Sequence, residues 1–160
     1  QRIRMVKVLA HAAGAEGMVG GQAIDIESEG KDLSLEELRE LHSLKTGALI
    51  HAAVLSAAAL AADLPHDRAS AIDAFGRTIG IAFQIKDDIL DIEGETHVIG
   101  KPSGSDEKSG KATYPALFGV DASRHRCDEL LHSALADLES FGAAAAPLEW
   151  LARYIVERGQ

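Results

Sequence analysis

The chain has 160 residues and a formal net charge of −9 at pH 7, and 46% of its residues are hydrophobic and 26% charged. This length and composition suit one compact domain, and they exclude a disordered, collagen-like or disulfide-rich chain. The negative charge argues against nucleic-acid partners and against electrostatic membrane anchoring. A phosphate-bearing substrate therefore requires local basic groups or a bridging metal ion.

Cysteine usage and hydropathy favour a reducing compartment and no membrane anchor. The single cysteine, Cys127, cannot form an internal disulfide, and no four-ligand zinc pattern is present. The least charged stretch, residues 46–62, is shorter than a bilayer span and is interrupted by His51 and Ser56. We expect a cytoplasmic protein.

Helical periodicity dominates the chain from its start. Apolar residues recur at three- and four-residue spacing, and the alternation typical of strands is almost absent, so the pattern predicts an all-α fold. A first helix is expected over residues 2–28. Its apolar stripe is thinned by Gly14, Gly17, Gly20 and Gly21, where another element can approach closely.

The next two helices have recognisable starts. A capping box, Ser34 with Glu37, predicts a helix from residue 34 to about 62, and a third helix follows over 65–93 with Pro65 in its first turn. Residues 94–111 lack periodicity and predict a mobile functional loop. Further helices are expected over 114–119, 121–141 and 147–158.

Four polar residues on the third helix form the strongest candidate site. At 3.6 residues per turn, Gln84, Asp87, Asp88 and Asp91 occupy neighbouring positions on one face. Carboxylates this close repel one another, and hard oxygen ligands one turn apart suit a Mg²⁺ ion that also binds water and substrate phosphates. The alternative is a solvated acidic face paired with Lys86.

A second candidate is the sequence Lys45-Thr46-Gly47 in the middle of the second helix. A glycine at such a position costs about 1 kcal/mol relative to alanine, which suggests a kink or a close approach. If Lys45 faces the same cleft as Asp87, it can donate charge-assisted hydrogen bonds to a phosphate.

Two weaker candidates lie elsewhere. The loop offers Lys101 and Lys111 to an anion, although it does not match the phosphate-binding template of nucleotide-binding loops, because alanine follows Lys111 and no strand precedes the loop. Gln22 and Asp25 share one face of the first helix at i, i+3 spacing.

Together and in this order, these motifs closely resemble those of short-chain polyprenyl diphosphate synthases, above all the bacterial farnesyl diphosphate synthases. The matching segments are Gly-Met-Val-Gly-Gly-Gln-Ala-Ile-Asp at 17–25, Lys45-Thr46-Gly47, Phe83-Gln84 with Asp87-Asp88-x-x-Asp91, Gly100-Lys101, and Gly-Lys-Ala-Thr-Tyr-Pro at 110–115.

The resemblance implies an isoprenoid-synthase-type helical bundle around a central cavity, Mg²⁺ dependence and a homodimer. The implied reaction condenses an allylic diphosphate with isopentenyl diphosphate to give geranyl or farnesyl diphosphate. It implies that Asp87 ligates Mg²⁺ while Asp88 and Asp91 order its water, and that Lys45, Lys101 and Lys111 hold diphosphate. Thr46 and Gln84 are expected to face the allylic cation, with Gln22 and Asp25 supporting the cavity wall.

One departure from the family is large. Its members carry a first aspartate-rich motif upstream, and nothing in residues 1–16 replaces it. We therefore interpret residues 1–160 as the C-terminal part of one synthase domain, inactive alone, with apolar faces of the first three helices left uncovered. The alternatives are a non-catalytic diphosphate-binding subunit of a prenyl synthase, and a terpene cyclase of the same fold.

Overall fold

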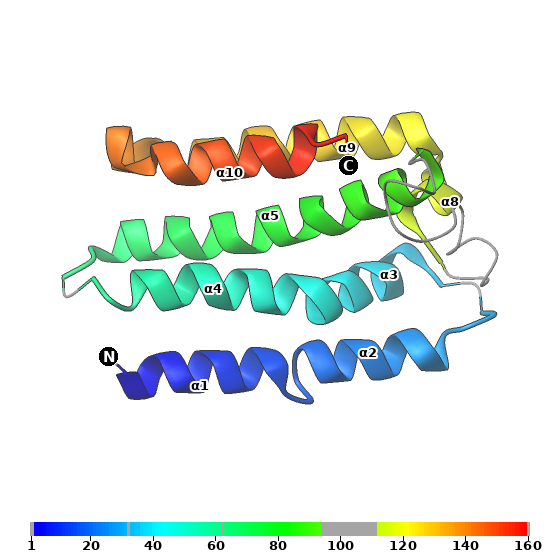
Figure 1. Ribbon diagram of the computed structural model, residues 1–160, viewed down its shortest axis with the longest axis horizontal. Coiled ribbons are helices and arrows are strands. Elements are labelled where there is room, and N and C mark those ends of the chain that lie inside the picture. Colours follow the sequence, from blue (N-terminus) through cyan, green and yellow to red (C-terminus); the bar gives the residue numbers. More distant parts are fainter. Residues whose placement is uncertain (1, 32, 62, 94–111, 160) are drawn as a thin grey trace.

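The computed structural model describes residues 2–31, 33–61, 63–93 and 112–159, and most of these residues are helical (Figure 1). In these ranges there is no strand, so the all-α prediction is confirmed. The α-helices are α1 (Arg2–Ala13), α2 (Met18–Glu27), α3 (Leu35–His42), α4 (Ala48–Ala58), α5 (His66–Glu93), α8 (Tyr114–Phe118), α9 (Val120–Leu138) and α10 (Ala146–Glu157). A π-helix, η1 (Ser43–Gly47), joins α3 to α4, and a 3₁₀-helix, η2 (Glu139–Ala145), joins α9 to α10.

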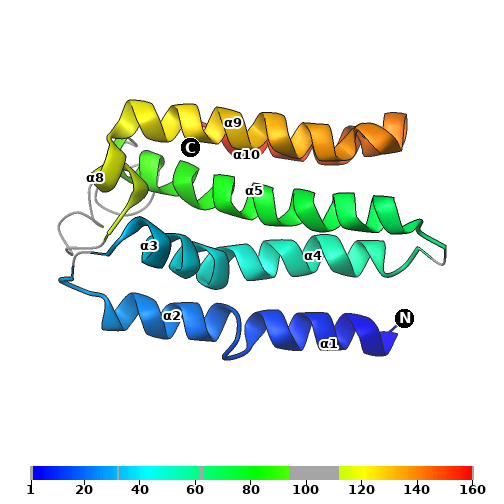
Figure 2. The same cartoon turned by 180° about the vertical axis from the view of Figure 1, so that it is seen from behind.

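The long helices lie side by side in layers, with α5 near the centre. Figures 1 and 2 show α1 and α2 in one layer, α3 and α4 in the next, then α5, and then α9 and α10. The middle helix α5 packs against α9 on one side and against α4 and η1 on the other. Its residues Phe75, Ile79, Ala82, Ile85 and Ile89 are at most 1% exposed and form the centre of the core. Within the described ranges, no helix combines the length and apolar character needed to cross a bilayer.

Two predicted helices are each divided in the structure. The first, expected over 2–28, breaks between α1 and α2, where Gly17 leaves the helical conformation with φ −140° and ψ −129°. Only glycine fits there, because a side chain would collide with the backbone of Ala12. The second begins at the predicted capping box, where Ser34 N–H donates to Glu37 Oε2 at 2.8 Å and Glu37 N–H donates to Ser34 Oγ at 3.3 Å. It widens into η1 before α4 and ends at Ala58 rather than near 62.

Later boundaries agree with expectation except at one turn. The third predicted helix is α5, which begins one residue after Pro65. The helix expected over 121–141 ends earlier, as α9, because Gly142 adopts a left-handed φ of 56° inside η2. The predicted loop over 94–111 lies outside the described residues.

Glycine residues allow the backbone of η1 to contact the backbones of α5 and α2 directly. A Cβ atom built on Gly80 of α5 would lie 2.9 Å from the Cα of Gly47, and one built on Gly21 of α2 would lie 2.6 Å from the Cα of Lys45. Real Cβ atoms do not approach other atoms so closely. The close approach suggested by Gly47 is therefore confirmed, and the helix bends there through a π-helix, a common form of local distortion at functional sites.

The expected uncovered apolar face exists on the first segment. Ile3, Val6 and Leu9 on α1 are 79%, 66% and 56% exposed, and Val19 and Ile26 on α2 are 53% and 60% exposed. On the second and third predicted helices no comparable stripe is present among the described residues, since Leu60 and Ile92 are the exposed large apolar residues there. The expectation is thus confirmed for the first segment and wrong for the other two.

Substituting Gly80 by Ala should destabilise the chain by about 1–3 kcal/mol, because the added methyl group must push η1 away from α5. Gly47→Ala is the matched control on the opposite side of this contact. Its Cβ would meet only the carbonyl oxygen of His42, at 3.3 Å, and alanine is the better helix former, so we expect little change. Equilibrium denaturation measures the free energy of unfolding of both variants. An equal loss of stability in Gly80→Ala and Gly47→Ala would contradict the proposed backbone contact.

Candidate functional site

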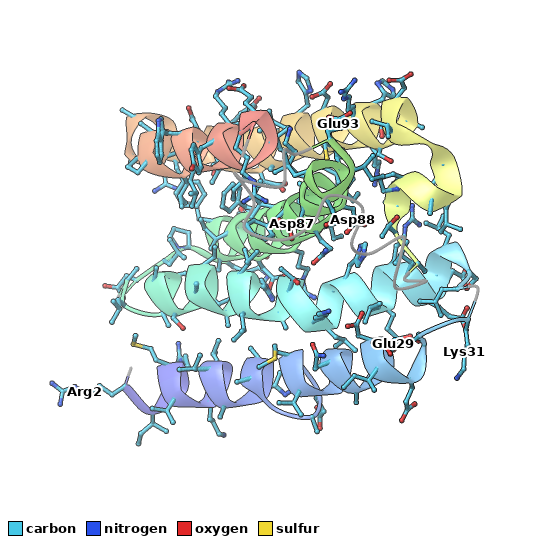
Figure 3. All side chains as sticks on the ribbon, turned by 45° about the vertical axis from the view of Figure 1, so that its right-hand side comes forward. Arg2, Glu29, Lys31, Asp87, Asp88 and Glu93 are labelled. Atoms are coloured by element: carbon cyan, nitrogen blue, oxygen red, sulfur yellow. The ribbon has the colours of Figure 1, made fainter. Side chains whose placement is uncertain are left out.

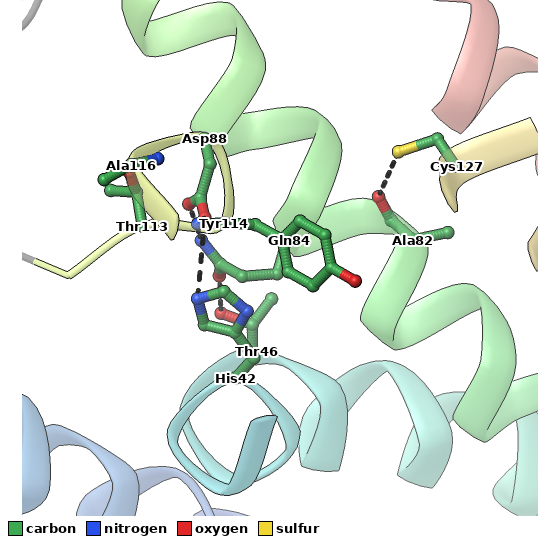
Figure 4. Close-up of polar contacts among 9 residues, drawn as sticks. All are labelled: His42, Thr46, Ala82, Gln84, Asp88, Thr113, Tyr114, Ala116 and Cys127. Atoms are coloured by element: carbon green, nitrogen blue, oxygen red, sulfur yellow. Dashed lines mark hydrogen bonds and ion pairs between the residues drawn. The ribbon is translucent and has the colours of Figure 1, made fainter. Parts of the chain in front are cut away.

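A chain of hydrogen bonds joins η1, α5 and the start of α8. Thr46 Oγ1 donates to Gln84 Oε1 at 2.7 Å, and Gln84 Nε2 donates to Asp88 Oδ1 at 3.0 Å. Asp88 Oδ2 in turn accepts the backbone N–H of Tyr114 at 2.9 Å (Figure 4). The spacing of four residues between Gln84 and Asp88 places both on one side of α5, and the Gly47–Gly80 contact brings Thr46 within reach of them.

Next to this chain, Lys45 is already paired. Its Nζ lies 2.6 Å from Oδ2 of Asp25 on α2, and the two side chains are 30% and 12% exposed. The structure therefore places Lys45 against Asp25 and Thr46 against Gln84. Gln22 lies one turn earlier on α2 and is exposed.

The three aspartates of the acidic motif have different surroundings. Asp87 is 53% exposed, whereas Asp88 and Asp91 are 4% and 3% exposed. Figure 3 shows Asp87 and Asp88 next to each other on α5. A solvated acidic face is therefore ruled out, because two of its three carboxylates are buried.

Asp87 contacts the end of the chain. Arg158 NH2 donates to Asp87 Oδ1 at 3.2 Å, and the guanidinium of Arg158 lies 4.3 Å from the centre of the Phe83 ring. Such cation–π contacts stabilise a guanidinium over an aromatic face. The Nε atom of Arg158 is buried and has no hydrogen-bond partner in the described part of the chain.

The residues present fit a shared metal site rather than a complete one. No group of three His, Cys, Asp or Glu side chains among the described residues is placed to hold a metal ion. Mg²⁺ usually takes one or two protein carboxylates and completes its coordination with water and substrate phosphates. Asp87, with a hard and accessible oxygen, meets that requirement, while both oxygens of Asp88 already accept hydrogen bonds.

The cavity beside these residues is small. Asp25, His42, Lys45, Gln84 and Asp88 line a space of about 50 Å³, enough for water but not for a diphosphate. A larger space of about 450 Å³ lies between α1, α4 and α5, and none of the predicted site residues lines it. The described residues around Lys45 thus enclose a space that holds water but no diphosphate.

His42 is a site residue that the sequence did not reveal. It is 6% exposed, and its Nε2 lies 3.6 Å from Asp88 Oδ2, longer than a hydrogen bond. Burial, helped by the positive charge of Lys45 and opposed by Asp25, lowers the pKa of His42 to about 4. The ring is therefore neutral at pH 7.

Some site residues carry no pattern in the sequence. A lone histidine on an apolar helix resembles a core residue, and neither the backbone N–H of Tyr114 nor Arg158 belongs to a spacing that predicts the aspartate contacts. The predicted anion-binding residues Lys101 and Lys111 lie outside the described residues.

The lowered pKa of His42 predicts a pH dependence of stability. Between pH 6.5 and about 4 the unfolded chain binds a proton at this residue that the folded chain does not, so the free energy of unfolding falls as the pH falls. The loss attributable to His42 is at most about 3 kcal/mol. Denaturation curves measured across this pH range should give a free energy of unfolding that depends less steeply on pH in His42→Gln than in wild type. The same pH dependence in both proteins would contradict the assignment.

Comparison with known proteins places this geometry in a family. The polyprenyl synthetase family model matches residues 1–146. Farnesyl diphosphate synthase of Escherichia coli is 42% identical over 162 residues, which cover 99% of this chain and 54% of that protein.

Solved structures agree with the sequence matches. An FPP/GFPP synthase from Zymomonas mobilis superimposes with a TM-score of 0.83 and 37% identity, covering 97% of this chain and 51% of the other. A Helicobacter pylori geranyltransferase complexed with magnesium and isoprenyl diphosphate superimposes with a TM-score of 0.81 and 28% identity, covering 97% and 50%. These matches confirm the expected isoprenoid-synthase-type fold.

The chain spans about half the length of the curated relatives that it matches. The family match nevertheless extends over most of the chain and includes the described residues of the site other than Arg158. The chain belongs to the polyprenyl synthetase family.

Proposed function

We propose that this chain supplies the allylic-diphosphate side of a Mg²⁺-dependent prenyltransferase, which condenses isopentenyl diphosphate with dimethylallyl or geranyl diphosphate. The observation that carries the proposal is the convergence of Lys45, Thr46, Gln84 and Asp25 from three helices, with the accessible Asp87 three residues after Gln84 on α5. The similarity to farnesyl diphosphate synthases supports the same chemistry.

The reaction begins with cleavage of the allylic C–O bond, so the site must stabilise a departing diphosphate and an allylic cation. A bound Mg²⁺ supplies Lewis-acid stabilisation of the developing negative charge. Asp87 would hold this ion. Lys45 would donate charge-assisted hydrogen bonds to the diphosphate after exchanging its contact with Asp25, and Lys101 and Lys111 are proposed to join it.

The neutral polar residues act on the other product of that cleavage. Thr46 would direct the lone pairs of its hydroxyl oxygen at the allylic cation, and Gln84, which accepts the Thr46 proton, would face the cation beside it. Released diphosphate is the base proposed for the final proton loss. Gln22 and Asp25 would support the wall, and Asp91 would order water around the metal ion.

The whole protein is proposed to be a cytoplasmic homodimer in which this chain forms the C-terminal part of a single synthase domain. The coverage of about half of each relative supports the incomplete domain. The exposed apolar side chains of α1 and α2 support additional packing on that side of the molecule. A non-catalytic subunit is not favoured, because the related proteins are named as synthases.

Incubated alone with Mg²⁺, isopentenyl diphosphate and geranyl diphosphate, this chain should form no farnesyl diphosphate above background, because its described cavity is too small for a diphosphate. Mass spectrometry of the products checks this outcome. Robust turnover by the chain alone would overturn its interpretation as an incomplete domain.

In the complete enzyme, Asp87→Ala should lower kcat by about 10²–10³-fold, a loss comparable to removing one electrostatic contact to a transition state. Its midpoint of thermal unfolding should change little, because Asp87 is half exposed. Asp67→Asn, an exposed carboxylate at the opposite end of α5, is the control. If Asp87→Ala kept full activity, the metal-binding assignment would be wrong.

A further inference from the structure

The hydrogen bonds around Asp88 have a fixed direction. An ionised carboxylate can only accept hydrogen bonds, and both oxygens of Asp88 do so, from Tyr114 N–H at 2.9 Å and from Gln84 Nε2 at 3.0 Å. The carboxylate is 4% exposed and belongs to the buried interior of α5. The backbone N–H of Tyr114 thus anchors one oxygen and leaves the other facing Gln84.

The hydrogen bond between Gln84 and Asp88 also determines which group donates between Gln84 and Thr46. Because the carboxamide must turn its NH₂ group to Asp88, its oxygen faces Thr46, and that oxygen can only accept. The Thr46 hydroxyl, 2.7 Å away, must therefore be the donor. The donor and acceptor properties of Asp88 and Thr46 therefore fix which end of the Gln84 carboxamide is the NH₂ group and which is the oxygen.

We propose that Asp88 is a positioning residue that orients the Gln84 carboxamide and thereby directs the Thr46 hydroxyl proton away from the substrate. The lone pairs of Thr46 Oγ1 then remain available to a positively charged carbon, whereas a freely rotating hydroxyl would also present its proton. This inference rests on the proposed function, because it assumes that Thr46 faces an allylic cation.

The members of this arrangement come from three elements, η1, α5 and α8, which fix their relative positions. Thr46 lies on η1, whose backbone touches α5 at the Gly47–Gly80 contact. Gln84 and Asp88 lie one turn apart on α5, and Tyr114 begins α8, where Thr113 Oγ1 caps the helix by accepting the N–H of Ala116 at 3.3 Å. A rotation of the Gln84 carboxamide would place its oxygen against the oxygen of Asp88, and nothing would donate between them.

Three variants separate orientation from simple packing. Asp88→Asn can keep the Tyr114 contact through its oxygen, while its NH₂ group donates to Gln84 and turns that carboxamide around. Gln84→Glu places two carboxylates side by side. The double variant Gln84→Glu with Asp88→Asn restores an acceptor that faces Thr46 and keeps one negative charge in the pair.

Equilibrium unfolding of the complete enzyme measures the coupling without any catalytic assay. Gln84→Glu should raise the unfolding equilibrium constant at least about tenfold, and the double variant should restore it to within about threefold of wild type. Hydrogen exchange at the Tyr114 amide should stay slow in Asp88→Asn, as a check that the anchor is intact. Absence of rescue in the double variant would overturn the proposed direction.

Steady-state kinetics of the complete enzyme tests the catalytic consequence. Asp88→Asn should lower kcat by about tenfold or more while the KM for the allylic diphosphate changes little, and the double variant should recover most of the loss. Glu93→Gln, which removes one charge at the end of the same helix, is the control and should keep wild-type kcat. Full activity of Asp88→Asn would refute the positioning role, even if the unfolding experiment shows that Gln84 and Asp88 are coupled.

The two proposals fail in different ways. If wild-type enzyme forms no prenyl product, the proposed function fails, and the unfolding experiment still reports on the hydrogen-bond direction. If product forms but the variants behave as Glu93→Gln does, only the role of Asp88 fails.

Discussion

The contact of the π-helix η1 with α5 is the constraint on which the site depends. Gly47 and Gly80 meet without side chains between them, and Gly21 lets α2 reach the other side of η1. Thr46 can contact Gln84, and Lys45 can contact Asp25, only because these backbones are so close. Glycine is costly inside a helix, so its presence at these positions reflects a packing requirement that outweighs helix propensity.

Burial divides the acidic motif into parts with different chemistry. Asp88 and Asp91 are inside the protein, where a carboxylate requires hydrogen-bond donors, and Asp88 obtains two of them from Gln84 and from the backbone of Tyr114. Asp87 remains accessible and pairs with Arg158, which itself lies over Phe83. One helix turn thus contains a buried carboxylate that fixes geometry and an accessible one suited to a metal ion shared with phosphates.

The same distinction makes the proposed diphosphate site compatible with an acidic chain. Long-range repulsion from a net charge of −9 acts on polyanions in general, but charge at short range is set by Lys45 and by any cation held at Asp87. The small cavity beside Lys45 and the exposed apolar face of α1 and α2 both fit a chain that provides about half of the family's length.

The sequence alone was sufficient for the all-α class, the capping box at Ser34 and the main helices, because periodicity and capping are local properties. It offered the polar residues of η1 and α5 as candidates through motif spacing and family resemblance, and the structure shows which of them touch. It could not divide the first helix at Gly17, reveal the neutral buried His42, or tell which aspartate is accessible. Those features depend on which atoms of other helices lie nearby. The tertiary structure decided them, since burial, backbone contact and the direction of a hydrogen bond are set by neighbours distant in the sequence.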